Sequence, residues 1–379
     1  MAQIEQINNG KIIIDSDEKI TKNQFFSILK STFEVLSTKN PYEVKIDNSI
    51  IKLHAKQVTY LGNPHRSFKK RIQLSEGWGE SLKNENSFLI GLYKYKSTLM
   101  YVFFDKANFL NRKTNNSSAH VSTFDLLNAF ENGIFTKKDI RGNIITVVKN
   151  ELAYDFLNKL VNRKVKIANE IILFEDFKNS LNSKYNGITC YSEMIKDNYK
   201  NKFQPEWVGF FLEYKFEIFL NKNPELKLIC NYQSNKKRGE IDLDLNFNNK
   251  YYGDLKAHSN ESTAILGNDK SNINKALNIY NKIWYIVFNH ETKKDKDFSF
   301  EVTKFWNESQ NKEDLMSYSK KMKNKITFTD FKILEINNYN KQYLTDFKQG
   351  MNSNGLPRET KIKIDKSSID NFLIYNGFF

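Results

Sequence analysis

Apolar and polar positions follow different periods along the chain, and in the first half they predict both strands and helices. Short runs rich in β-branched and aromatic residues are typical of strands. They cover residues 50–60, 87–95 and 99–104. Ser122 and Asp125 then have the spacing of a helix capping box, and the apolar positions that follow are spaced as in a helix up to Gly133. We therefore expect an α+β arrangement in this half.

The second half shows a more regular order of elements. Residues 207–220 are almost all apolar and follow Pro205, which suits the start of a helix. Three strands are expected at 226–233, 239–247 and 250–259, with Asn248 and Asn249 as a tight hairpin turn. A helix at 271–282 and a buried strand at 284–288 complete the order.

A polar segment at 179–204 predicts the junction between the two halves. A chain of 379 residues is long enough for two domains, and 40% hydrophobic content is enough to build their cores. We expect an N-terminal α+β region at 1–195 and a C-terminal α/β domain with an extension at 196–379.

The charge balance favours an anionic partner. The chain has 58 Lys and Arg against 44 Asp and Glu, a formal net charge of +14. Nucleic acid fits better than a membrane surface, because no basic helix with a broad apolar face stands out. The abundance of Asn, Lys and Ile is also typical of an AT-rich genome, which offers another explanation for part of the lysine excess.

Targeting and cysteine patterns point to the cytoplasm. Cys190 and Cys230 form no disulfide framework and no zinc-ligand pattern. The sequence shows neither a basic start followed by an apolar stretch nor an 18-residue apolar run, so we expect a cytoplasmic protein without a membrane partner.

Two expected strands carry the candidate chemistry. Side chains alternate across a strand, so Asp242 and Asp244 share one face of the first strand, and Asp254 and Lys256 share one face of the next. Neighbouring carboxylates repel, and a bound Mg²⁺ relieves that repulsion. A lysine beside the metal would orient the attacking water or offset charge on a phosphate. The alternative is an ordinary solvated ion pair on a strand surface.

The helix at 207–220 adds a stripe of acidic residues. Glu213 and Glu217 lie one turn apart on an otherwise apolar helix, so either residue is a candidate to support a metal site. The stripe is equally explained as the solvated edge of the helix. His258, two residues after Lys256, is a candidate phosphate contact or a solvated histidine at the end of a strand.

These residues together resemble a known nuclease core. Gly239-Glu240-Ile241-Asp242, a hairpin and then Asp254-Leu255-Lys256 stand between an acidic helix and a helix–strand pair, as in the PD-(D/E)XK nuclease superfamily. The chain length and the extra N-terminal half resemble type II restriction endonucleases. The resemblance implies a restriction-endonuclease-like core, a mixed β-sheet flanked by helices, and an N-terminal half that recognises DNA.

The resemblance also implies the roles of individual residues. Asp242, Asp254 and the backbone carbonyl of Leu255 would hold Mg²⁺, Lys256 would be the catalytic lysine, and Glu213 would be an accessory acid. Ile241 stands where the family often has proline, which leaves Asp244 as a rival for Asp242.

The implied activity is hydrolysis of double-stranded DNA at specific sites, leaving 5′-phosphate ends. The implied partners are a second copy of the chain in a homodimer and a DNA methyltransferase of the same restriction–modification system. The alternatives are a structure-specific repair or recombination nuclease, an RNA-directed nuclease and a non-catalytic DNA-binding protein.

Clustered cations and polar loop residues are the expected DNA contacts. Four cations within six residues are typical of a segment that neutralises phosphates, although a solvated basic loop has the same composition. The expected DNA-binding residues are Arg66, Lys69, Lys70, Arg71, Asn116 and Arg358.

Overall fold

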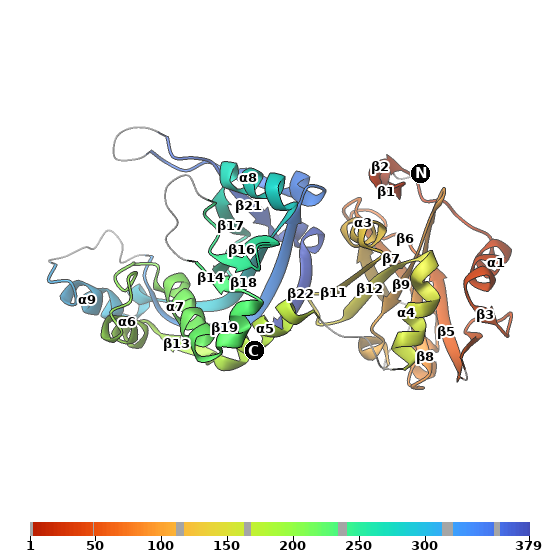
Figure 1. Cartoon of the computed structure of the whole chain (residues 1–379), viewed down its shortest axis with the longest axis horizontal. Coiled ribbons are helices and arrows are strands. Elements are labelled where there is room, and N and C mark those ends of the chain that lie inside the picture. Colours follow the sequence, from red (N-terminus) through yellow and green to blue (C-terminus); the bar gives the residue numbers. More distant parts are fainter. Residues whose placement is uncertain are drawn as a thin grey trace. The chain divides into compact units, whose positions relative to one another are not determined.

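The chain divides into two compact units, Met1–Lys166 and Ile167–Phe379 (Figure 1). The computed structural model describes residues 3–47, 49–110, 117–162, 168–233, 241–312, 321–351 and 357–379. Its mixture of helices and several sheets agrees with the expected α+β class. Among the described residues, no helix is both long enough and apolar enough to cross a membrane.

The boundary between the units lies before α5 (Asn169–Ser180), earlier than the junction expected at 195/196. Phe174 and Phe177 of α5 pack on Phe216 of α7 (Trp207–Lys222), with ring centroids 5.6 and 4.9 Å apart. Buried aromatic contacts of this kind hold α5 in the core of the second unit. The polar segment that follows α5 is therefore internal to that unit.

The first unit is built on one mixed sheet with the strand order β11-β12-β9-β8-β5-β4-β3. The strands are β3 (Glu34–Val35), β4 (Tyr42–Ile46), β5 (Ser49–Gln57), β8 (Ser87–Tyr95), β9 (Thr98–Phe104), β11 (Ile134–Lys138) and β12 (Ile144–Lys149). Helices α1 (Lys22–Thr32) and α4 (Ala153–Val161) share one apolar cluster with the sheet. The expected strands at 87–95 and 99–104 are confirmed.

The other face of this sheet is covered by α3 (Thr123–Asn132) and a small antiparallel sheet, β10-β7-β6. The small sheet consists of β6 (Thr59–Tyr60), β7 (Lys69–Gln73) and β10 (Ser118–Ser122). The predicted capping box is present, since Ser122 Oγ accepts a hydrogen bond from the backbone N–H of Asp125 at 3.3 Å. Strands β1 (Ile4–Asn8) and β2 (Lys11–Asp15) form a hairpin, and α2 (Trp78–Ser81) is a single turn.

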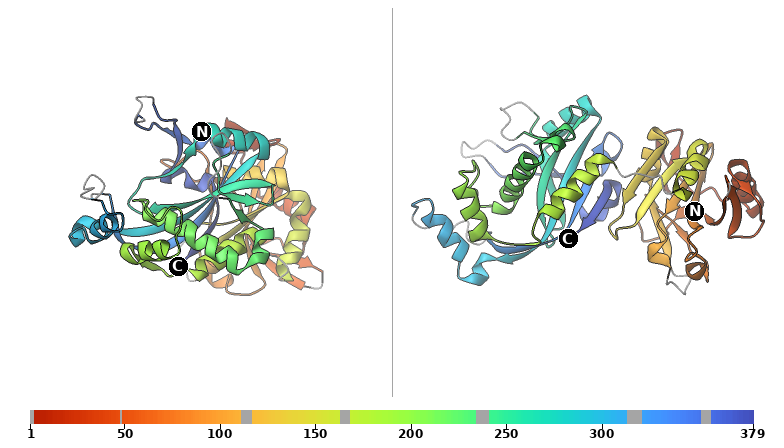
Figure 2. Two further views of the ribbon diagram at one scale, coloured as in Figure 1. Left: turned by 60° about the vertical axis from the view of Figure 1, so that its left-hand side comes forward. Right: turned by 60° about the horizontal axis from the view of Figure 1, so that its bottom comes forward.

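The second unit is built on the sheet β13-β19-β18-β16-β15-β14, with β22 paired to β19. Its strands are β13 (Lys184–Asn186), β14 (Asn231–Tyr232), β15 (Leu245–Phe247), β16 (Tyr251–Ser259), β18 (Lys282–Lys294), β19 (Lys323–Asn337) and β22 (Leu373–Phe378). The crossover helix α8 (Lys270–Tyr280) joins β16 to the parallel strand β18. These strands and their flanking helices can be followed in Figure 2.

A second small sheet of this unit, β17-β21-β20, shares an apolar cluster with α8. It consists of β17 (Ala264–Asp269), β20 (Thr345–Phe347) and β21 (Lys361–Asp365). Helices α6 (Gly187–Lys196) and α9 (Glu301–Glu308) complete the α-helices among the described residues of the unit.

Most expected elements around the candidate site are confirmed, including the helix at 207–220, the helix at 271–282 and the strand at 250–259. Asn248 and Asn249 have positive φ angles of 57° and 59°, as the predicted hairpin turn requires. The strand expected at 226–233 is wrong for most of its length, because a 3-10 helix begins at Pro224 and only β14 is extended. Strand β17 was not expected.

The strand expected at 239–247 is shorter than predicted. Only Leu245–Phe247 pairs as a strand, residues 241–244 lie outside regular structure, and Gly239 and Glu240 lie outside the described residues.

Candidate functional site

Asp254 and Lys256 lie on β16, between β15 and β18 in the sheet. Lys256 Nζ is 2.5 Å from Asp254 Oδ2, and their side chains are 23% and 6% exposed. Lys256 Nζ also lies 5.5 Å from the ring centroid of the fully buried Tyr285 on β18. The alternative of a solvated surface pair therefore does not describe this arrangement.

Glu213 of α7 lies beside this pair. The pKa of Glu213 is raised to about 8, first by burial and then by repulsion from Asp244 and Asp254, while the charge of Lys256 acts in the opposite direction. Tyr232 of β14 donates a hydrogen bond from its hydroxyl to Glu213 Oε2 at 3.0 Å. Helix α7, strand β16 and the residue just before β15 thus bring three carboxylates and one lysine together.

Asp242 and Asp244 have different neighbours. In the β15–β16 ladder Leu245 lies opposite Gly253, so Asp244 and Asp254 are the next residues along the two strands. The backbone carbonyl of Asp244 accepts a hydrogen bond from the N–H of Gln233 at 2.7 Å. The strand register thus associates Asp244 with Asp254, and the charge of Asp244 is one of those that raise the pKa of Glu213 after burial.

Asp242 is exposed, and its backbone carbonyl accepts a hydrogen bond from Asn268 Nδ2 of β17 at 2.7 Å. Its negative charge helps to raise the pKa of Asp269 and of Tyr285, after burial in both cases. The metal-binding role that the resemblance implies for Asp242 stays a prediction.

Glu217 and His258, the other candidates, have different surroundings. Glu217 is one of several groups near Tyr199, whose pKa is raised first by burial and then by the charge of Glu213. His258 is buried, with Nδ1 2.9 Å from Asn289 Oδ1 and Nε2 3.2 Å from the carbonyl oxygen of Ala264.

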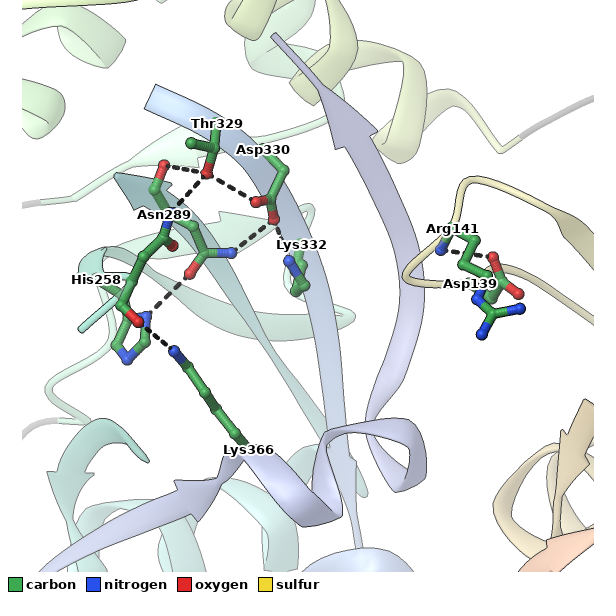
Figure 3. A network of polar contacts seen from close by, with 9 residues as sticks. Asp139, Arg141, His258, Asn289, Thr329, Asp330, Lys332 and Lys366 are labelled. Carbon is green, nitrogen blue, oxygen red and sulfur yellow. Dashed lines mark hydrogen bonds and ion pairs between the residues drawn. The ribbon is translucent and has the colours of Figure 1, made fainter. Parts of the chain in front are cut away.

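Figure 3 shows that Asn289 continues this network from His258 to Asp330. Asn289 Nδ2 donates to Asp330 Oδ1 at 2.7 Å, and Thr329 Oγ1 donates to Asp330 Oδ2 at 2.9 Å. Since both ring nitrogens contact the protein interior, His258 fits neither expectation, the phosphate contact or the solvated histidine. It joins three strands of the sheet.

The donor chemistry of the site fits a hard divalent cation. Within the described ranges, no group of three or more His, Cys, Asp or Glu side chains is arranged to hold a metal ion. Mg²⁺ uses only one or two carboxylates, however, and takes its other ligands from water and phosphate. Burial is the main cause of the raised pKa of Glu213, and the charges of Asp244 and Asp254 add to it, a repulsion that such a cation would offset.

The expected DNA-contacting cations near β7 do not all face solvent, because side chains alternate between the two faces of a strand. Lys69 and Arg71 of β7 are partly exposed and Arg66, in the preceding loop, is exposed, but Lys70 is fully buried. Lys70 Nζ lies 3.8 Å from Asp17 Oδ1, and burial lowers the pKa of Lys70 to about 8. The structure thus places Lys70 inside the unit instead of at a phosphate.

The other two expected contacts are loop residues. Asn116 lies outside the described residues. Arg358 is exposed, and its backbone N–H donates to the carbonyl oxygen of Gly350 at 3.1 Å.

Sequence reasoning missed two tyrosines at the site, Tyr232 and Tyr285. Tyr232 reaches Glu213 because β14 pairs with β15, and Tyr285 lies beside Lys256 because β18 pairs with β16. Both positions depend on strand pairing, and the local sequence carries no signal for either role.

One comparison with known proteins gives a match. A family model described as Methylase-associated X1 matches residues 50–157, which is less than a third of the chain and lies within the first unit. Its description suggests a restriction–modification context, in agreement with the resemblance seen in the second unit. No curated protein and no solved structure matches the chain.

Proposed function

We propose that this protein is the Mg²⁺-dependent endonuclease of a restriction–modification system. It hydrolyses phosphodiester bonds in double-stranded DNA at specific sites and leaves 5′-phosphate ends. The observation that carries the proposal is the pair of the buried Asp254 and the partly exposed Lys256 beside Glu213 and Asp244. The methylase-associated match and the net charge of +14 support the biological setting and the anionic substrate.

Asp254 is proposed as one metal-binding carboxylate, and the contacts favour Asp244 over Asp242 as the second. The backbone carbonyl of Leu255 is the further ligand that the resemblance implies. When bound, Mg²⁺ would stabilise charge on the phosphate and make bound water more acidic.

Lys256 is proposed to orient the attacking water and to offset the charge that develops on the phosphate. The water oxygen forms a bond to phosphorus, the bond to the 3′ oxygen breaks, and the water loses a proton while the departing oxygen gains one. The products are a 5′-phosphate and a 3′-hydroxyl. Glu213, held by Tyr232, is proposed as the accessory acid.

Two partners belong to this proposal. A palindromic site matches a two-fold symmetric protein, so we propose a homodimer, and a monomer in light scattering both free and on DNA would contradict it. A methyltransferase of the same system would protect the host DNA, which agrees with the methylase-associated description.

The test is to incubate the purified full-length protein with phage and plasmid DNA, in Mg²⁺ or in EDTA, and to sequence the fragment ends. We expect discrete fragments with Mg²⁺ from the wild type, and none from Asp254→Ala or Lys256→Ala. Asp346→Ala is the matched control, because Asp346 forms an exposed pair with Lys270 in the same unit at 2.8 Å.

Cleavage by Asp254→Ala within a few-fold of the wild type would contradict the site. Cleavage confined to branched DNA would favour a structure-specific nuclease. DNA binding without cleavage by any variant would favour a non-catalytic protein.

A second comparison separates Asp242 from Asp244. We expect Asp244→Ala to reduce cleavage more than Asp242→Ala does. A larger loss of cleavage in Asp242→Ala than in Asp244→Ala would favour Asp242 as the second metal-binding carboxylate, as the resemblance implies.

A further inference from the structure

The small sheet β10-β7-β6 of the first unit presents one regular polar face. Arg71 lies opposite His120 on one side and Thr59 on the other, and Gln73 lies opposite Ser118. Because side chains alternate along a strand, these residues and Lys69 point to the same side of the sheet. We call this set the outer face; it comprises Thr59, Lys69, Arg71, Gln73, Ser118 and His120.

The opposite side of the same strands is fixed in the protein core. Ile72, Ala119 and Val121 are at most 3% exposed and belong to the apolar cluster that includes α3. Asp17 Oδ2 accepts a hydrogen bond from the backbone N–H of Tyr60 at 2.7 Å and anchors β6. The outer face is therefore carried on a buried, well-packed support.

The outer face combines positive charge with groups that form directed hydrogen bonds. None of its six residues is acidic, whereas it carries a lysine, an arginine, a glutamine and a histidine. Ser118 Oγ lies 2.8 Å from His120 Nε2, which fixes the imidazole ring. Arg66 is exposed just before β7, where its carbonyl oxygen accepts from the N–H of Lys69 at 3.0 Å.

We propose that the outer face reads base edges of duplex DNA in the major groove, with Arg71 and Gln73 as the base-contacting residues and Arg66 and Lys69 at phosphates. This rests on the proposed function, which makes duplex DNA the substrate. The major groove admits a two-stranded antiparallel ribbon, and β7 and β10 form such a pair over five residues. Arginine pairs with guanine and glutamine with adenine through two hydrogen bonds each, whereas phosphate contacts carry no sequence information.

The test uses the full-length chain with Asp254→Ala, which prevents cleavage, and a duplex DNA library with a randomised centre. We expect the parent to enrich one sequence motif. Adding Arg71→Lys, which keeps the charge but loses the paired hydrogen bonds, should relax the motif at one or two positions, with about 5- to 150-fold less discrimination there. Gln73→Ala should relax a different position.

Lys69→Ala should weaken binding to all sequences equally and reduce the salt dependence by about one phosphate contact. Lys45→Ala is the matched control, because Lys45 is an exposed cation on β4 that pairs with Glu34 at 3.7 Å. It should change neither the motif nor the affinity. Thermal melting of each variant verifies that it is folded.

An unchanged motif in both Arg71→Lys and Gln73→Ala would overturn the inference. Binding of duplex DNA by the Asp254→Ala parent without any sequence motif would overturn it too, as would a preference of that parent for RNA or for a protein. These outcomes are separate from the proposed function, which is judged by Mg²⁺-dependent cleavage. A wild type that never cuts, with a motif that still depends on Arg71, would overturn only the nuclease proposal.

Discussion

Both units of the molecule contain close lysine–aspartate pairs, and the Lys137–Asp125 pair of the first unit differs from the Lys256–Asp254 pair of the second in what surrounds it. In the first unit Lys137 Nζ lies 2.8 Å from Asp125 Oδ2, with side chains 5% and 0% exposed. Asp125 also accepts the backbone N–H of Ser122 at 2.7 Å, so its carboxylate caps α3. This pair joins a helix to β11, and its role is structural.

The pair in the second unit has unbalanced charge around it. Asp254 and Lys256 lie beside Glu213 and Asp244, and the pKa of Glu213 is raised first by burial and then by repulsion from the other two carboxylates. Lys256 is also more exposed than Lys137, at 23% against 5%. The partly exposed pair Asp254–Lys256, which we call the open pair, has excess negative charge around it and is suited to binding a metal and a phosphate. The fully buried pair Asp125–Lys137, which we call the closed pair, is suited to stability.

The largest effect should come from opening the closed pair. Lys137→Met leaves the Asp125 carboxylate buried without its cation, and we expect a loss of about 3–5 kcal/mol in the free energy of unfolding. Urea denaturation measures this loss. The cleavage rate per folded molecule should not change, so a variant that is stable but inactive would contradict the structural role.

The same substitution in the open pair should have the opposite profile. We expect Lys256→Met to reduce the cleavage rate by about 10²- to 10³-fold, because the cation that offsets phosphate charge is lost. The free energy of unfolding should change by less than in Lys137→Met, since Lys256 is partly exposed. Single-turnover cleavage and urea denaturation, measured on both variants, test the contrast directly.

These pairs also show what the sequence could predict. The helix at 207–220 and the strand at 250–259 were correct because each has a strong local pattern, and that was enough to identify Glu213, Asp254 and Lys256 as candidates. Strand β17 was missed because its partner β21 lies about a hundred residues later, and Leu266 is 43% exposed. Long-range pairing leaves little local trace.

Prediction of the site from sequence was limited in a similar way. The alternation of side chains along a strand could not decide between Asp242 and Asp244, because residues two apart point to the same face, and residues 241–244 do not form a strand at all. The run of four cations did not predict that the Lys70 side chain is buried, because Asp17, which lies near Lys70 Nζ, is more than fifty residues away in the sequence.

Lys70 extends the comparison to a fully buried lysine that lies 3.8 Å from Asp17 Oδ1. Burial lowers the pKa of Lys70 to about 8 in the folded state, against 10.5 as its ordinary value. Between these values the unfolded chain binds a proton that the folded protein has released, so the free energy of unfolding rises with pH across this window. Below pH 8 both states are protonated and the contribution is constant.

We expect this rise to total about 3 kcal/mol, from ~1.4 kcal/mol per pKa unit. Lys70→Met should abolish the rise and stabilise the protein at pH 7. Urea denaturation at pH 7 and pH 10 gives the free energy of unfolding of the wild type and of the variant. The difference between the two proteins at each pH cancels the titration of groups other than Lys70. Equal pH dependence in the two proteins would contradict the burial of a charged Lys70.

The smallest effect on cleavage should come from removing the hydrogen bond that orients Glu213 beside the open pair. Tyr232→Phe removes the hydroxyl that donates to Glu213 Oε2 at 3.0 Å and keeps the ring that packs edge-on against Phe216. One hydrogen bond to a carboxyl group contributes about 1 kcal/mol, so the cleavage rate should fall about 5- to 10-fold with the fold intact. Tyr154→Phe, which loses an exposed hydrogen bond to Asp47 at 3.4 Å, is the control and should leave cleavage unchanged. A rate equal to the wild type in Tyr232→Phe would mean that the proposed role of Glu213 does not depend on this hydrogen bond.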